Sequence, residues 1–302
     1  MKKTILFTGR RCGLNLPKVP LIKGSCTRLR VVVSETVLLD WQSPNALMNT
    51  RLTFLLICLI KTSFCLAQSI ASNTYVWNDS PLTKKPTSEQ RAILEGSTTD
   101  FSHLEIHATT LPAHHKPHPA HQHDDEELII IKEGQLTITI EGKTRTLGPG
   151  SVALMMPGDK HGFANNGEAS ATYYVMRYTS KEPVDLERGR KAGGSFWIDW
   201  NEVAFKPHDK GGIRRMFDRA TAMTKRFEMH VTTLNQSLWS HPPHTHRAAE
   251  ILLMKDDSAQ ESIDGKLVAA TRGDLIFLES NVPHALQNTS KGSCTYFAFQ
   301  FE

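Results

Sequence analysis

Residues 118–127 read HPAHQHDDEE, and residues 241–250 read HPPHTHRAAE. The two stretches are separated by 123 positions, and the similarity extends well beyond them. At this offset, 20 of the 74 residues between positions 104 and 177 are identical to their counterparts, without a gap. A repeat with one fixed offset indicates that one structural unit occurs twice along the chain.

Within each unit the hydrophobic pattern predicts β-strands. Residues 128–131 (LIII) form a short apolar run typical of a buried strand, and residues 136–140 (LTITI) alternate with period two. Glu141-Gly142 and Asp264-Gly265 follow such segments, and glycine favours tight hairpin turns. Short, evenly spaced strands with turns between them predict an all-β sandwich or barrel.

The repeat also sets the expected domain boundaries. We predict a first domain at 75–178 and a second at 197–302. The intervening residues, 179–196, contain the basic, glycine-rich stretch RGRKAGG and are expected to form an exposed linker.

The N-terminal region has a different character. Met48 and Arg51 precede the apolar run LTFLLICLI (52–60), and small residues follow before position 68. This arrangement predicts a signal peptide at 48–67 and a periplasmic or secreted protein, without a stable membrane anchor, because the run is too short to span a bilayer. Residues 1–47 show no sustained periodicity, and we interpret them as an over-long N-terminal extension.

Charge and cysteine are unevenly distributed along the chain. The whole chain carries a formal charge of +4, but residues 68–302 contain 25 Lys and Arg against 29 Asp and Glu. Nucleic-acid binding depends on neutralising phosphates and is therefore not expected. Four of the five cysteines also precede position 68, so after removal of residues 1–67 Cys294 would have no partner for an intrachain disulfide.

The histidines form the main chemical signal. His121 and His123 are two residues apart in an extended segment, so their side chains share one face, which Glu127 can join. His161 follows after a turn. Three imidazoles and one carboxylate suit a divalent transition metal (Mn, Fe, Ni, Cu or Zn) and leave coordination positions open. The second unit repeats the set at the same spacing, which allows up to two metals per chain. Its members are His244, His246, Glu250 and His284.

The motifs resemble those of the cupin superfamily, and the duplication resembles a bicupin. His121 to Gly134 resembles the first cupin signature, and Gly150 to Asn165 resembles the second. The resemblance implies two double-stranded β-helix barrels of jelly-roll type in tandem, each holding a metal through its quartet. The second unit is the looser match, since it has Asp257 and Asn281 where glycine is usual.

Other polar residues near the ligands are less specific. His118 and His241 recur at matching positions and are candidate acid–base groups at the pocket mouth, although a solvated loop is the simpler interpretation. The acidic residues immediately before Glu127 are expected to be exposed. The orientation of His107 and His230, on an earlier strand, stays undecided. No organic cofactor is predicted.

Several functions are compatible with this resemblance. The leading hypothesis is a metal-dependent oxidoreductase of the dioxygenase type acting on a small oxygen-rich molecule. One alternative is a metal-dependent isomerase or lyase for a sugar acid, and another is a non-catalytic periplasmic protein that binds a metal or small ligand. The expected partner is a small-molecule substrate, and a homodimer remains an open alternative.

Overall fold

The computed structural model describes residues 68–302, so the predicted extension (1–47) and signal peptide (48–67) lie outside the described residues. Apart from α2 (Leu186–Lys191) and two short 3₁₀ turns, η1 (Trp77–Asp79) and η2 (Trp200–Glu202), the regular elements described are strands. The predicted all-β class is confirmed. Among the described residues, no helix is long and apolar enough to cross a membrane.

The strands of the first unit form a seven-stranded and a three-stranded sheet, and every neighbouring pair is antiparallel. The large sheet has the order β11 (Phe196–Ile198), β8 (Val152–Met155), β5 (Glu126–Glu133), β10 (Ala171–Ser180), β4 (Phe101–Leu111), β3 (Ser88–Gly96) and β2 (Leu82–Lys85). The small sheet has the order β7 (Lys143–Leu147), β6 (Leu136–Ile140) and β9 (His161–Ala164).

The second unit has the same arrangement, again antiparallel throughout. Its large sheet has the order β1 (Asn73–Tyr75), β18 (Leu275–Leu278), β15 (Ala249–Asp256), β20 (Cys294–Phe301), β14 (Phe227–Leu234), β13 (Gly211–Arg219) and β12 (Lys206–His208). Its small sheet has the order β17 (Lys266–Thr271), β16 (Ser258–Ile263) and β19 (His284–Asn288).

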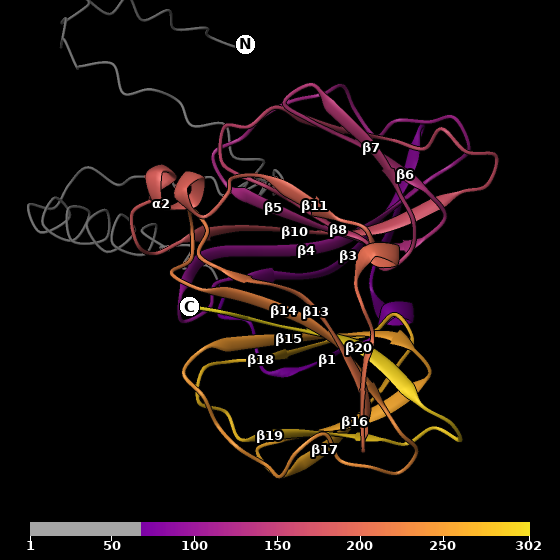
Figure 1. Cartoon of the computed structure of the whole chain (residues 1–302), viewed down its shortest axis with the longest axis vertical. Coiled ribbons are helices and arrows are strands. Elements are labelled where there is room, and N and C mark those ends of the chain that lie inside the picture. The colour runs from indigo at the N-terminus through magenta and orange to yellow at the C-terminus, as the bar shows by residue number, and fades with distance from the viewer. Residues whose placement is uncertain (1–67) are drawn as a thin grey trace, which may run out of the picture. The chain divides into compact units, whose positions relative to one another are not determined.

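Each pair of sheets encloses its own apolar interior, and a third core lies between the two large sheets. Along β10, Tyr173 and Val175 point into the first barrel, whereas Tyr174 and Met176 join the third core, as the period-two geometry of a strand requires. Phe299 of β20 belongs to this same shared core. Figure 1 shows the large sheets side by side and the small sheets at opposite ends. The two barrels are therefore joined by sheet-on-sheet packing.

Each barrel also receives an edge strand from the sequence that precedes the other. β1 pairs with β18 of the second barrel, and β11 pairs with β8 of the first. The boundaries predicted at 75 and 197 thus fall inside these exchanged strands. In the predicted linker, the Arg188 side chain donates hydrogen bonds to the carbonyls of Thr221 and Ala222, at 2.8 and 2.9 Å. The linker is therefore not wholly exposed, because this arginine anchors α2 to the loop between β13 and β14.

The two hairpin turns predicted from Glu141-Gly142 and Asp264-Gly265 are present. Glu141 and Gly142 have φ values of 48° and 76°, and Asp264 and Gly265 have values of 49° and 79°. Positive φ at both central residues is the geometry of a tight hairpin whose twist matches the flanking strands. The turns join β6 to β7 and β16 to β17.

A glycine at the exchange region allows a close aromatic contact. Gly150 has a φ of +87°, and a Cβ atom there would lie 2.5 Å from Cε3 of Trp200. Gly142 has a similar φ of +76°, but nothing lies within 4 Å of its Cβ position. An alanine at either position would be strained by the backbone conformation, but only an alanine at position 150 would also overlap a neighbouring side chain.

We expect Gly150→Ala to reduce the free energy of unfolding by about 1–3 kcal/mol more than Gly142→Ala does. This difference is the typical cost of overpacking. Both substitutions share the cost of a left-handed backbone, so the difference isolates the Trp200 contact. Urea unfolding of the two variants measures it, and equal losses would mean that Trp200 moves aside without cost.

Candidate metal centres

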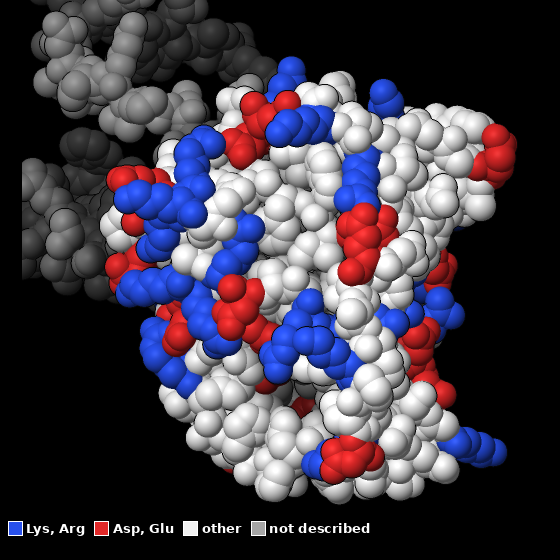
Figure 2. All heavy atoms as spheres, in the orientation of Figure 1, with Lys and Arg blue, Asp and Glu red and all other residues white. Residues whose placement is uncertain are grey.

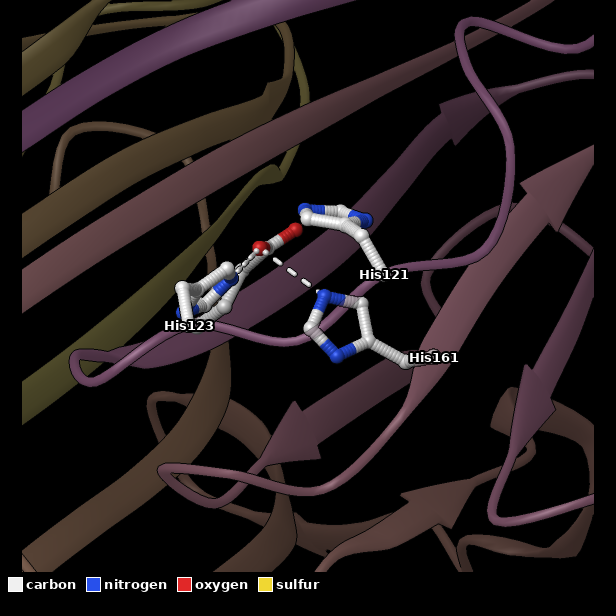
Figure 3. A group of neighbouring side chains, drawn as sticks. His121, His123 and His161 are labelled. Atoms are coloured by element: carbon white, nitrogen blue, oxygen red, sulfur yellow. Dashed lines mark hydrogen bonds and ion pairs between the residues drawn. The ribbon is translucent and has the colours of Figure 1, made fainter.

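The structure brings together the four ligands predicted for the first barrel. His121 and His123 precede β5, Glu127 is the second residue of β5, and His161 begins β9. One donor atom from each lies within 4.8 Å of all the others. In Figure 3 the three imidazole rings turn toward a common point. Three imidazole nitrogens and one carboxylate oxygen therefore lie close together in the first barrel.

Backbone hydrogen bonds hold these segments in place. The amide of His121 donates to the carbonyl of His161 at 2.9 Å, and the reverse bond measures 2.8 Å. The amide of Gly158 donates to the carbonyl of His123 at 2.9 Å. Gly158 has a φ of +81°, a conformation that glycine adopts without strain. The glycine of the second motif therefore holds the loop that carries His123.

The outer nitrogens of two imidazoles are anchored to carbonyl groups. Nδ1 of His123 lies 2.9 Å from the carbonyl of Asp125, and Nδ1 of His161 lies 2.9 Å from that of Asp159. Because a carbonyl oxygen only accepts, each Nδ1 carries the proton and Nε2 faces the cluster. This is the orientation of metal-bound histidines in proteins.

The cluster is electrostatically coupled. Burial raises the pKa of Glu127, but its hydrogen bond with His123 and the nearby imidazole of His161 lower it to about 2. Burial lowers the pKa of His123, whereas its hydrogen bonds to Asp125 and Glu127 raise it to about 9. Burial, together with the neighbouring imidazoles, lowers the pKa of His121 to about 4. A carboxylate thus stays charged in the interior because a protonated imidazole faces it.

The donors of this cluster fit a divalent ion. Nε2 of His161 is buried and has no hydrogen-bonding partner; it lies 3.4 Å from the carboxylate of Glu127. A buried polar atom without a partner is unfavourable, and a metal bound at this nitrogen would satisfy it. Imidazole nitrogens and a carboxylate are ligands that Mn, Fe, Ni, Cu and Zn accept. The group could therefore hold a divalent metal ion.

Sequence reasoning missed the support behind His123. Asp125 Oδ1 lies 2.7 Å from Nδ1 of His123, and Arg177 Nη2 lies 2.8 Å from the same carboxylate. The expectation that the acids before Glu127 are exposed is wrong for Glu126, which is fully buried, and for Asp125, whose side chain is only 13% exposed. Glu126 accepts hydrogen bonds from the hydroxyls of Tyr178 and Thr221 at 2.8 and 2.6 Å. Asp125 lies only two residues from His123, but Arg177, Tyr178 and Thr221 lie far away in the sequence, so no local pattern marks their contacts.

The second barrel repeats the backbone framework. The amides of His244 and His284 donate to each other's carbonyls at 3.2 and 3.0 Å, and the amide of Asn281 donates to His246 at 2.8 Å. Asn281 and Asp257 have φ values of 62° and 66°. Asn and Asp are among the side chains that tolerate this conformation. The loop geometry therefore survives both replacements of glycine.

The second donor set is looser than the first. His244, His246 and His284 form a group within 4.8 Å of one another, and His244 is exposed. The Glu250 carboxylate lies 3.1 Å from Nε2 of both His246 and His284 but outside that group. At the position of Arg177 the second barrel has Gln300, whose amide lies 3.3 Å from Nε2 of His246. The second cluster therefore lacks the charged support of the first.

A cavity adjoins each cluster, with volumes of about 200 and 250 Å³. The two candidate acid–base histidines line these cavities: the ring of His118 lies edge-on to His121, with centroids 4.3 Å apart, and His241 contacts His244 in the same way at 4.1 Å. His107 and His230 also line the cavities, which settles the orientation that alternation left undecided.

We expect Asp125→Asn to weaken metal binding in the first barrel about 10- to 100-fold, because it removes the charge that orients His123. Asp124→Asn is the matched control, since Asp124 is an exposed neighbouring acid. Competition with a chromophoric chelator measures both affinities. Equal affinities of the two variants would contradict the supporting role of Asp125.

Comparisons with known proteins agree with this architecture. The family model for the Cupin domain matches residues 108–177, and that for the AraC-like ligand binding domain matches residues 228–302. Each match covers one of the two repeated units.

Solved structures resemble most of the described chain at low sequence identity. AerE from Microcystis aeruginosa has a TM-score of 0.60 and 14% identity, with 77% of this chain and 100% of that chain covered. The oxalate decarboxylase of Lactobacillus farciminis, a formate complex, has a TM-score of 0.60 and 10% identity, with 77% and 87% covered. Identities this low establish the fold alone. With two cupin-type barrels in tandem, the chain is a bicupin of the cupin superfamily.

Proposed function

We propose that this bicupin is a metal-dependent oxidoreductase of the dioxygenase type that acts on a small oxygen-rich acid. The observation that carries the proposal is the cavity beside the first cluster, which is lined by His121 and Glu127 and also by Lys85 and Arg177. A volume of about 200 Å³ suits a small molecule. The cavity gives a ligand access to both the candidate metal position and two cationic side chains.

The chain's own residues would bind and orient such an acid. The Arg177 guanidinium is held by Asp125 at 2.8 Å, which reduces the freedom it would lose on binding a carboxylate. Phe163 and Val175 supply apolar wall. A carboxylate between the cationic side chains would direct its other oxygens toward the cluster, away from bulk water.

The metal would be held by His121, His123, Glu127 and His161. When bound, a redox-active divalent ion supplies Lewis acidity to the substrate oxygens and a means of using dioxygen. His118 is exposed at the mouth and lies edge-on to His121, where its imidazole is available to exchange a proton with a bound acid.

Two structural relatives support a small carboxylate and a divalent metal. One is the formate complex of the Lactobacillus farciminis oxalate decarboxylase, and another describes Mn(II) centres in the Bacillus subtilis oxalate decarboxylase. These relatives favour, as a second candidate, a metal-dependent isomerase or lyase acting on a carboxylic acid. A non-catalytic protein that binds a metal or small ligand would use the same cavity.

We further propose that the protein acts in the periplasm or outside the cell, on the basis of the predicted signal peptide. We propose that nucleic acids are not among its partners. On the face drawn in Figure 2, Lys and Arg alternate with Asp and Glu instead of forming a continuous basic surface. Such mixed charge argues against nucleic-acid binding at this face, because nucleic-acid binding needs clustered cations.

Metal analysis tests the first step of the proposal. We expect the purified protein to bind up to two divalent ions per chain, and His161→Gln to remove one of them. His114→Gln, which changes an exposed loop histidine paired with exposed Glu168, should leave the metal content unchanged. Protein that binds no metal after incubation with Mn, Fe, Ni, Cu or Zn would overturn the proposal.

Oxygen uptake with a panel of catechols, flavonoids and small keto acids separates the candidate reactions. We expect His121→Ala and Glu127→Ala to reduce activity by more than the roughly 10- to 100-fold that changes behind the ligands cost. His244→Ala should reduce it less, because the first cluster has the complete, better supported donor set. Turnover without oxygen uptake would favour the lyase or isomerase, and the reverse ranking would place the reaction in the second barrel.

A further inference from the structure

One buried acid of the second barrel has no role in the scheme above. Glu261 lies on β16, is 0% exposed, and neither of its carboxyl oxygens has a hydrogen-bonding partner. Its neighbours on the same face of the strand, Ala259 and Ile263, belong to the apolar interior of the barrel. Burial of a carboxyl group in such surroundings is unfavourable unless something compensates.

The first barrel shows that the fold does not need this acid. Glu261 pairs with Leu286 of β19, and at the equivalent register Ile138 pairs with Phe163 of β9. Ile138 is fully buried among apolar residues. The carboxyl group is therefore a difference between two barrels with the same framework, and packing alone does not explain it.

Glu261 lines the cavity that adjoins the second histidine cluster. That cavity measures about 250 Å³ and is also lined by His244, Glu250 and His284. Burial and the charge of Glu250 raise the pKa of Glu261 to about 9, against a minor lowering by the backbone of Ala285. Full burial without a partner favours the protonated form of Glu261, which can donate a hydrogen bond to a ligand oxygen.

The rest of this cavity is less cationic than its counterpart. Gln300 occupies the position of Arg177 in the first barrel, and it also lines the cavity. Lys210 lines it as well, but its ammonium group already donates to the carbonyls of Trp239 and Ser240 at 3.1 and 3.0 Å. A ligand with a single carboxylate and a neighbouring oxygen suits these surroundings better than a dianion.

We propose that Glu261 makes the second cavity a separate binding site for a small 2-oxo or 2-hydroxy acid. Its carboxyl O–H donates a hydrogen bond to the 2-oxo or 2-hydroxy oxygen of the ligand, while the two carboxylate oxygens of the ligand face the histidine cluster. The inference rests on the proposed function in one respect, that the second cluster holds a metal. Beyond the proposed function, it names Glu261 as a binding residue, specifies the class of ligand, and assigns the two barrels different ligands.

Titration calorimetry tests the proposal in a His161→Gln background, which disables the first cluster. Pyruvate and propionate are the probes, because they differ in the 2-oxo oxygen. With Mn²⁺ bound, we expect pyruvate to bind about tenfold or more tightly than propionate. Glu261→Ile, which introduces the side chain of the first barrel, should abolish that preference. Glu261→Gln keeps a donor at the site and should retain most of it.

Thermal unfolding provides the second measurement, without metal or ligand. We expect Glu261→Ile to raise the Tm, since it replaces an unpaired buried acid with an apolar side chain that the same framework already accepts. A lowered Tm would assign Glu261 a structural role and overturn the proposal.

The calorimetry also separates the two proposals. If the second cluster binds Mn²⁺ but pyruvate does not bind, or binds equally to Glu261→Ile, the role of Glu261 is refuted while the metal site stands. If this cluster binds no metal, both the role of Glu261 and the proposed second metal centre are refuted.

Discussion

Both candidate centres depend on a reciprocal pair of backbone hydrogen bonds. His121 and His161 exchange amide and carbonyl bonds, and His244 and His284 do the same. These bonds join the loop before β5 or β15 to the first residue of β9 or β19, so two sequence motifs become neighbours. Because these bonds join backbone atoms, the side chains around them can differ between the two barrels while the bonds remain. The quartets are therefore as much a product of backbone pairing as of the ligand residues themselves.

Electrostatic compensation is the second constraint. The Glu127 carboxylate is buried in an otherwise apolar barrel, and it remains charged because His123 holds a proton against it. A divalent ion at the same position would replace that proton and supply a stronger counter-charge. Asp125 and Arg177 extend the compensation outward from His123. Stability and metal binding thus draw on the same set of charges.

The two barrels share a frame but differ in chemistry. Where the first has Asp125 and Arg177, the second has Ala248 and Gln300, and where the first has Ile138, the second has Glu261. The second barrel therefore lacks the charged pair beside the first cluster and has instead a carboxyl group inside its cavity. The proposed division between the two sites follows from this difference, because a cavity selects its ligand by where its donors and cations lie.

The sequence by itself determined the repeat, the all-β class, the hairpin turns and the residues of both candidate clusters, because these depend on local periodicity and fixed spacing. It also identified Asn281 as a departure, but only its φ of 62° showed that the loop is preserved. The exchange of β1 and β11, the support of His123 by Arg177, and the unpaired state of Glu261 were decided by the tertiary structure. Each depends on contacts between residues far apart in the chain, and local sequence pattern carries no record of such contacts.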